Sequence, residues 1–448
     1  MAKIIKLIKK LLTRSKNPPL PSSHSHIIAR NQHNLSKTEI HSNALKVLNR
    51  LNSSGFQAYL VGGSVRDLLL GKVPKDFDVA TNATPPEIRK LFTNARIIGR
   101  RFKLAHILFN RDIIEVATFR GSDVIDESHK TNESGMLIRD NVYGSLDEDA
   151  WRRDFTVNSL YYNIDDATII DFTGGFQDIK NRKIRMIGDP ILRYKEDPVR
   201  MLRAIRFSAK LDFEIEETTA KPIASLSHLI KEVSNSRLFD EVTKLYQCGQ
   251  GEAVQRLLVQ HGLFAKLFAQ SHDLFASEHN ITNLITLALE STDRRIKDNK
   301  PVNPAFLFAI LLWFPLRDKA IELQNEQSLP PLPALEKAMS IVLSKQNQVV
   351  NLPKRFSLIA REIWLLQFRF SKRTGRRAFL LLTHPRFRAA YDFLVLRALA
   401  EDESLELADW WTEFQERDEA GREEMVSIIN KETPSKPKRR RKRAKQAE

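Results

Sequence analysis

The chain has 448 residues, of which 42% are apolar, and a formal net charge of +16. This length is enough for two or three domains that each bury a core. No stretch approaches the ~18 apolar residues of a membrane span, and the single cysteine excludes a disulfide framework, so we expect a soluble protein of the cytoplasm. Most of the net positive charge lies in residues 1–16 and 436–448, and such basic ends favour a polyanionic partner.

Residues 1–16 form a segment with its own pattern. Apolar side chains fall on one helical face and lysines on the other, as in a basic amphipathic helix. Such a helix can lie at the inner face of a membrane, dock on a partner protein, or order on RNA, and the pattern leaves these three interpretations open. Residues 17–26 are rich in proline and serine, which predicts a linker.

The folded part is predicted to begin with mixed strands and helices. Ser36–Glu39 matches the capping box of a helix N-terminus, and the helical run that follows ends at Gly55. Strands are predicted at 57–61, 76–80, 105–109 and 113–120, and short helices at 64–70 and 84–92. Beyond residue 197 the long periodic segments are almost all helical.

We therefore expect an α+β fold, with a mixed-sheet head followed by an all-α neck and body. The predicted divisions are a basic helix and linker at 1–35, a head at 36–172, a helical neck at 173–260, a helical RNA-binding body at 261–430 and a disordered basic tail at 431–448.

Two aspartates stand out on the second predicted strand. Asp76 and Asp78 are two residues apart, so their side chains leave the same face, while the apolar residue between them points into the core. Paired carboxylates suit Mg²⁺, which proteins hold through one or two carboxylates plus substrate phosphates. Glu115, on a neighbouring predicted strand, is of the right type to supply a third ligand.

Gly62, Gly63 and Ser64 stand where a predicted strand ends and a helix begins. Backbone N–H groups converge on anions at such a junction, and glycines let a triphosphate approach the backbone. Arg66 can offer a forked guanidinium to phosphate oxygens. The alternative is a plain strand-to-helix turn with Arg66 paired to a neighbouring acid, and only the combination with the aspartates favours a nucleotide site.

The pattern Gly62-Gly63-Ser64, twelve residues, then Asp76-Phe77-Asp78-Val79 resembles the nucleotidyltransferase signature of the polymerase-beta superfamily. The fuller string VGGSVRDLLLGKVPKDFDVATNATP is similar to class II members, the bacterial poly(A) polymerases and the CCA-adding tRNA nucleotidyltransferases. The resemblance implies that Asp76 and Asp78 hold catalytic Mg²⁺, with Mn²⁺ as an alternative. It also implies that a 3′ hydroxyl of RNA attacks the α-phosphate of ATP and pyrophosphate leaves.

A second motif runs from Arg152 to Asn158, as RRDFTVN. By the resemblance, Arg152 and Arg153 meet the triphosphate, and Asp154 meets the sugar or the active site. The alternative is an ordinary helix start with charged residues in its first turn. Whether Asp154 or Glu115 completes the metal site stays open.

A third motif, EDPVRMLR at 196–203, resembles the base-selecting motif of the same family. Asp197 is predicted to be a helix N-cap with proline at the first helical position, and Arg200 and Arg203 are spaced to share a face. A carboxylate and an arginine can read the edge of a base. The alternative is a capped helix with an i,i+3 ion pair.

The choice between poly(A) and CCA addition depends on finer features. The stretches 97–106, 302–316 and 375–398 are similar to those of poly(A) polymerases, and a basic tail suits RNA of varied sequence. We therefore expect poly(A) addition, with CCA addition as the alternative. A distant alternative is a non-catalytic RNA-binding adapter, but each of the four candidate acids is present.

The expected partners are RNA 3′ ends, together with RNA-degradation or RNA-chaperone proteins, and the expected enzyme is monomeric. The residues expected to contact RNA are Arg100, Arg101, Lys103, Arg439, Arg440 and Arg441. For the first three of these, the alternative is a solvated basic strand end.

Overall fold

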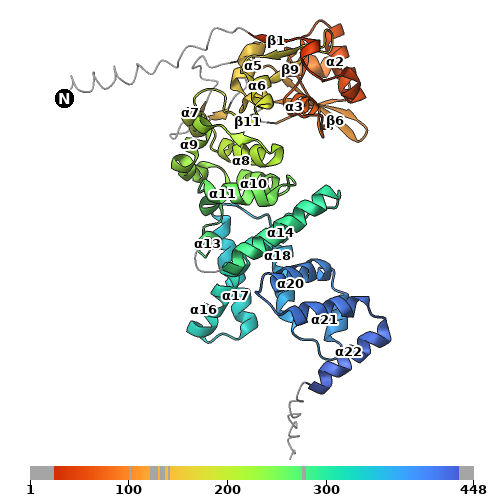
Figure 1. Cartoon of the computed structure of the whole chain (residues 1–448), viewed down its shortest axis with the longest axis vertical. Helices are drawn as coiled ribbons and strands as arrows, with labels where there is room; N and C mark the ends of the chain where they lie inside the picture. Colours follow the sequence, from red (N-terminus) through yellow and green to blue (C-terminus); the bar gives the residue numbers. More distant parts are fainter. Residues whose placement is uncertain are drawn as a thin grey trace, which may run out of the picture. The chain divides into compact units, whose positions relative to one another are not determined.

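The computed structural model divides into two compact units, Met1–Leu226 and Ser227–Glu448 (Figure 1). The residues that it describes are 25–99, 103–121, 130–131, 137–139, 142–274 and 279–432. Unit 1 is built on a mixed sheet and unit 2 is helical, so the predicted fold class is confirmed. Among the described helices, none has both the length and the apolar content that crossing a bilayer requires. The predictions for residues 1–16, Arg100, Arg101 and Arg439–Arg441 fall outside the described ranges.

An eight-stranded sheet in the order β1-β10-β9-β2-β3-β6-β5-β4 forms the centre of unit 1. Every neighbouring pair is antiparallel except β3 and β6, which run parallel. The strands are β1 (His26–Ile28), β2 (Ala58–Val61), β3 (Asp78–Thr81), β4 (Ala95–Ile98), β5 (Leu104–Phe109), β6 (Asp112–Thr118), β9 (Leu160–Tyr162) and β10 (Ile169–Asp171).

Helices cover this sheet and extend unit 1 beyond it (Figure 1). The α-helices are α2 (Ser42–Ser53), α3 (Gly63–Leu69), α4 (Pro85–Leu91), α5 (Leu146–Arg152), α6 (Gly175–Lys180), α7 (Pro190–Glu196), α8 (Val199–Leu211) and α9 (Glu217–Leu226). The 3₁₀ turns are η1 (Arg30–Gln32), η2 (Lys37–Glu39) and η3 (Thr156–Asn158). Two small two-stranded sheets pair β7 (Lys130–Thr131) with β8 (Leu137–Arg139), and β11 (Lys183–Ile184) with β12 (Glu214–Ile215).

Three local predictions were wrong. The capping box of Ser36 and Glu39 does form, but it closes the 3₁₀ turn η2, and α2 begins only after His41, whose Nδ1 accepts from the backbone of residue 43. The strand predicted at 76–80 begins at Asp78, because only from there does the backbone pair with β2 and β6. Strands also continue past residue 172, as the pair β11 and β12, whose two-residue strands are too short to produce a periodic pattern.

The sheet attaches α5 through a buried cluster. Val61, Ala80, Phe119, Ala150 and Tyr161 are at most 2% exposed and pack together. Because α5 ends at Arg152, this packing fixes where the arginine motif leaves the helix.

Unit 2 is helical throughout its described residues. It begins with the 3₁₀ turn η4 (Ser227–Glu232) and continues with α10 (Asn235–Tyr246), α11 (Gly251–Gln260), α12 (Phe264–Leu267), α13 (Ala269–His272), α14 (His279–Lys297), α15 (Pro304–Leu311), α16 (Trp313–Gln327), α17 (Pro331–Asn347), α18 (Lys354–Phe370), α19 (Arg377–Leu382), α20 (Phe387–Leu399), α21 (Leu405–Glu416) and α22 (Glu419–Glu432).

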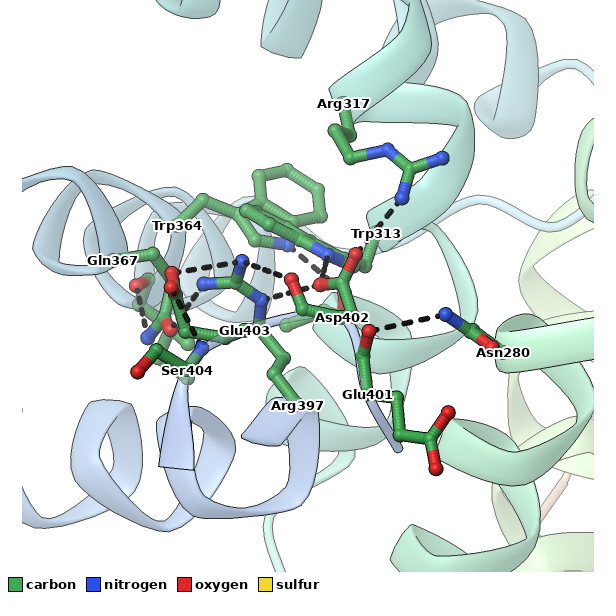
Figure 2. A network of polar contacts seen from close by, with 12 residues as sticks. Asn280, Trp313, Arg317, Trp364, Gln367, Arg397, Glu401, Asp402, Glu403 and Ser404 are labelled. Carbon is green, nitrogen blue, oxygen red and sulfur yellow. Dashed lines mark hydrogen bonds and ion pairs between the residues drawn. The ribbon is translucent and has the colours of Figure 1, made fainter. Parts of the chain in front are cut away.

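A buried polar network ties three of these helices together (Figure 2). The carboxylate of Asp402, in the turn after α20, accepts from Trp313 Nε1 at 2.7 Å, Arg397 Nε at 2.7 Å and Arg317 Nη1 at 2.8 Å. Arg397 Nη1 also donates to Gln367 Oε1 of α18 at 3.1 Å. Since a buried guanidinium needs its charge and donors satisfied, this network fixes α16, α18 and α20 against one another.

Candidate active site

A cavity of about 270 Å³ opens in unit 1 beside the parallel strands β3 and β6. It collects charged residues from four separate stretches of sequence. Its lining consists of Val61, Asp78, Val79, Leu104, Glu115, Ala117, Arg120, Asp149, Arg152, Arg153, Arg193, Glu196, Asp197 and Arg200. Members of all three sequence motifs and Glu115 therefore meet at one cavity, as a single nucleotide site would require.

Asp78 lies at the centre of this arrangement. It is the first residue of β3, directly opposite Val61 of β2 on one side and Glu115 of β6 on the other. Burial, followed by the neighbouring charge of Glu115, raises the pKa of Asp78 to about 6, with Asp76 adding a smaller push and Arg153 opposing it. The fold thus holds a carboxylate whose negative charge is unfavourable until a cation neutralises it.

Asp76 lies two residues before β3 and is exposed. The residues next to it and beyond alternate as the sequence predicts, with Phe77 and Val79 buried and Asp78 half-buried. Among the described residues, no three His, Cys, Asp or Glu side chains are grouped as a complete metal site. The oxygen donors of the two aspartates and Glu115 nevertheless fit Mg²⁺, which commonly takes part of its coordination from substrate phosphates and water.

Glu115 has a partner of its own. His106 of β5 stands opposite Glu115 in the antiparallel pairing with β6, and its Nε2 is 3.2 Å from Glu115 Oε1. His106, Glu115 and Asp78 therefore occupy matching positions on three adjacent strands. Sequence spacing alone missed His106 as a member of this row, because its place depends on the register between strands.

Gly62 joins β2 to α3 in a conformation that only glycine adopts without strain. Its φ is +77° and its ψ is −134°. A Cβ at this position would lie 3.6 Å from Arg153 Nη1 and 3.8 Å from Asp78 Oδ2. The glycine turn, the metal-type carboxylate and the second-motif arginine are therefore within contact distance of one another.

Ser64 and Arg66 turn inward. The hydroxyl of Ser64 donates to the carbonyl of Val61 at 3.0 Å and is buried. The guanidinium of Arg66 is 3% exposed, donates to Asp67 Oδ1 at 2.7 and 2.9 Å, and hydrogen-bonds Asn158. Neither residue lines the cavity, and in this arrangement both brace the strand-to-helix turn.

Arg153 is held by an acid that the sequence interpretation missed. Asp149, one helical turn earlier on α5, accepts from Arg153 Nη2 at 3.0 Å and from the hydroxyl of Tyr161 at 2.6 Å. Its other oxygen accepts from the backbone N–H of Arg120 at 3.1 Å. Burial alone would lower the pKa of Arg153, but Tyr161 and Asp149 raise it above its ordinary value, so the guanidinium stays charged.

Asp154 is committed to a different partner. Its Oδ2 accepts from Arg203 Nε of α8 at 2.7 Å, and its Oδ1 accepts from the N–H of Phe155 at 2.8 Å and from Asn158 Nδ2 at 3.3 Å. Burial would raise the pKa of Asp154, but the charge and hydrogen bonds of Arg203 outweigh it and lower the pKa to about 2. Asp154 and Arg203 do not line the cavity. Their ion pair links the second motif to the third.

The third motif meets the cavity through α7 and the start of α8. Asp197 is the C-cap of α7, and the N-cap of α8 is Pro198, one residue after the predicted cap. Asp197 Oδ1 nevertheless accepts from the N–H of Val199 at 3.3 Å. Arg200 pairs with Glu196, which also accepts from Arg193 Nη1 at 2.6 Å.

The side chain of Arg193 in turn binds the backbone of the second motif. Its Nη2 donates to the carbonyls of Arg152 and Arg153 at 2.6 and 2.7 Å. Burial, followed by the charge of Arg200, lowers the pKa of Arg193 to about 10. Besides His106, the residues to which the sequence assigned no role are Asp149, Arg193, Glu196 and Tyr161. Asp149 and Glu196 each lie four residues before the arginine that they bind, and this spacing was a local signal.

Lys103, in the segment before β5, is exposed and does not line the cavity. Arg100 and Arg101 precede it outside the described ranges. The predicted RNA contacts of this stretch therefore stay predictions.

Three family models match the chain. They are "Poly A polymerase head domain" over residues 58–185, "Probable RNA and SrmB-binding site of polymerase A" over 212–274, and "Polymerase A arginine-rich C-terminus" over 327–446.

Curated relatives match over nearly the whole length. The chain is 46% identical to poly(A) polymerase I of Salmonella typhi, over 98% of this chain and 97% of the relative. It is 48% identical to poly(A) polymerase I of Haemophilus influenzae, over 92% of this chain and 93% of the relative. The CCA-adding enzyme of Bacillus pumilus is 36% identical over only 50% of this chain and 54% of the relative.

Among solved structures, a tRNA-processing enzyme in its apo form I aligns with a TM-score of 0.57 and 21% identity, covering 88% of this chain and 97% of that one. This likeness supports the shared fold of a mixed-sheet head followed by helices.

Proposed function

Since this chain belongs to the poly(A) polymerase I family and is a polynucleotide adenylyltransferase, we propose that its cavity beside β3 and β6 joins AMP from ATP to the 3′ hydroxyl of RNA. The observation that carries this proposal is the meeting of Asp78, Glu115, Gly62 and Arg153 at one place. Bond formation at the α-phosphate releases pyrophosphate, and no template is needed.

The carboxylates of Asp76, Asp78 and Glu115 would hold Mg²⁺, or Mn²⁺ in its place. The bound metal supplies charge neutralisation at the phosphates and makes the attacking hydroxyl more acidic. The raised pKa of Asp78 supports this assignment, because a cation beside it relieves the repulsion from Glu115. Asp154 is proposed as a positioning residue, because its carboxylate is already occupied by Arg203.

Phosphate binding is assigned to the second motif. Arg152 and Arg153 line the cavity, and Arg153 reaches the glycine turn at Gly62, where a backbone without side chains leaves room for phosphate oxygens. Since Asp149 and Tyr161 fix the Arg153 guanidinium, its direction is set before the nucleotide arrives.

Base selection is assigned to Asp197 and Arg200, which line the same cavity from α7 and α8. A carboxylate accepts from the exocyclic amino group of adenine, and an arginine donates to a ring nitrogen. Because Glu196 holds Arg200 from behind, the donor presents a fixed edge to the base.

Primer extension with each of the four nucleoside triphosphates in turn tests this proposal. Purified protein should extend an RNA primer with ATP far faster than with CTP. Completion of CCA on a trimmed tRNA at a comparable rate would overturn it in favour of CCA addition.

A further inference from the structure

The turn between α18 and α19 concentrates positive charge. Its nine residues, 369–377, include five basic side chains and no acid. We call this segment the basic turn, and its cations are Arg369, Lys372, Arg373, Arg376 and Arg377. All are exposed except Arg373, which is half-buried.

These cations lack counter-ions. Within the part of the chain that the structure describes, none of the five forms an ion pair, and Arg373 Nε is buried without a hydrogen-bond partner. Some exposed arginines elsewhere in unit 2 are paired, for example Arg256 with Glu252 and Arg417 with Glu413. Five like charges so close together repel one another, and a polyanion would relieve that repulsion.

Aromatic rings accompany the cations. Lys372 Nζ lies 3.9 Å from the centre of the Phe368 ring, and the guanidinium of Arg373 lies 5.2 Å from the centre of the Trp410 ring. Phe368 and Trp410 are both half-buried, so part of each ring faces solvent. Cations interleaved with aromatic rings are typical of surfaces that bind single-stranded nucleic acid.

Helix stability does not explain the whole cluster. Arg369 at the end of α18 is favourable beside the negative end of a helix dipole. Arg376 and Arg377, however, cap and begin α19, where the same dipole disfavours cations. These two arginines therefore destabilise the start of α19 slightly.

The basic turn has a rigid base. Trp411 Nε1 donates to the carbonyl of Phe370 at 3.0 Å, and both side chains are fully buried. The N–H of Gly375 donates to Asn430 Oδ1 of α22 at 3.2 Å. Gln367, three residues before Phe370, belongs to the network of Asp402 (Figure 2).

We infer that the basic turn binds the phosphate backbone of single-stranded RNA through its five cations, which lie beside the half-buried rings of Phe368 and Trp410. This inference rests on the proposed function, which supplies RNA as the polyanion. The contacts are to phosphate, so they tolerate any RNA sequence.

Fluorescence anisotropy of a labelled single-stranded RNA, titrated with the full chain at several KCl concentrations, tests the inference. The titration contains EDTA and no nucleotide, so that no AMP is added to the RNA during the measurement. The test variant combines Lys372→Gln, Arg376→Gln and Arg377→Gln, and the control combines Arg256→Gln, Lys300→Gln and Arg417→Gln, which removes three ion-paired surface cations.

The test variant should bind RNA about tenfold more weakly, and its plot of log K against log salt should be shallower by about 2, from ~0.7 per lost phosphate contact. The control should match the wild type in both. Equal affinity and equal slope for the test variant and the wild type would overturn the inference, and would point instead to an acidic protein as the occupant of the basic turn.

A second measurement separates this inference from the proposed function. The test variant should keep the wild-type KM for ATP and raise only the KM for the RNA primer. If the wild type itself adds no AMP to RNA, the proposed function fails regardless of the anisotropy result. If AMP addition is normal but the KM for RNA is unchanged in the variant, only the basic turn is misassigned.

Discussion

The arginines of the candidate active site and those of the basic turn are held in opposite ways. In the cavity, Arg153 and Arg200 are each bound to a carboxylate, which fixes their direction. In the basic turn the cations have no acid partner within the described ranges. The comparison teaches that an arginine proposed to place one phosphate group is anchored by an acid, whereas cations proposed to follow a polyanion of variable sequence are left without one.

Removing the Asp78 carboxylate should have the largest effect on AMP addition. It should not change RNA binding by the basic turn. We expect Asp78→Asn to lower kcat for AMP addition by about 10³-fold or more, or about 4 kcal/mol, because the metal loses a ligand. RNA affinity in EDTA should be unchanged. Asp112→Asn, on an exposed part of β6, is the matched control and should keep its activity. Normal elongation by Asp78→Asn would show that the metal site is elsewhere.

Arg397, a buried arginine of unit 2, tests whether a cation needs an acid partner because it is buried, wherever it lies in the chain. Asp402→Ala should lower the free energy of unfolding by about 3 kcal/mol, because Arg397 would be left buried without its main counter-ion. Asp298→Ala breaks an exposed pair with Lys300 and should change stability by less than about 1 kcal/mol. Urea denaturation measures both, and equal losses in the two variants would contradict the argument.

The anchor of Arg153 can be removed directly. Asp149→Asn should lower kcat/KM for ATP by roughly 10- to 100-fold, as expected for a lost charged hydrogen bond of about 1.5–3 kcal/mol. Asp178→Asn is the control, because Asp178 is equally buried and pairs with Arg185 at 3.1 Å outside the cavity. If both variants weaken ATP use to the same degree, Asp149 acts through stability alone.

The smallest expected effect concerns the metal-free protein. Because the folded pKa of Asp78 is about 6, above its unfolded value of about 4, this group's stabilising contribution is complete below pH 4 and is lost as pH rises through 6. Metal-free Asp78→Asn should therefore be more stable than the wild type at pH 8, by about 2 kcal/mol, and similar to it at pH 4. Mg²⁺ should then stabilise the wild type and not the variant, and a wild type insensitive to Mg²⁺ would contradict the assignment.

The glycine turn and the aspartate pair could be predicted from the sequence because their signals are local. A strand that ends in Gly62-Gly63 and an alternation around Phe77 each need only a few neighbouring residues. The meeting of Asp78 with Glu115 also agrees with the predicted strands, although their direct opposition depends on the parallel register of β3 and β6.

The anchoring residues could not be predicted in the same way. Tyr161 of β9 reaches Asp149 of helix α5, and Arg193 binds the carbonyl of Arg152 from forty-one residues away. Arg66 is a second example, since its type suits phosphate but its donors bond Asp67 and Asn158, as in the alternative that the sequence left open. Which polar group a side chain chooses is decided by tertiary packing, and spacing in the sequence does not encode it.

Helix α8 carries two arginines, about one turn apart, that make different contacts. Arg200 faces the cavity, and Arg203 grips Asp154 at the base of the second motif. A helix is stiff over one turn, so a displacement of Arg200 would be transmitted to Arg203 and from there to Asp154. With the base-selecting role proposed for Arg200, the fit of a base in the cavity would then also affect the position of the second motif.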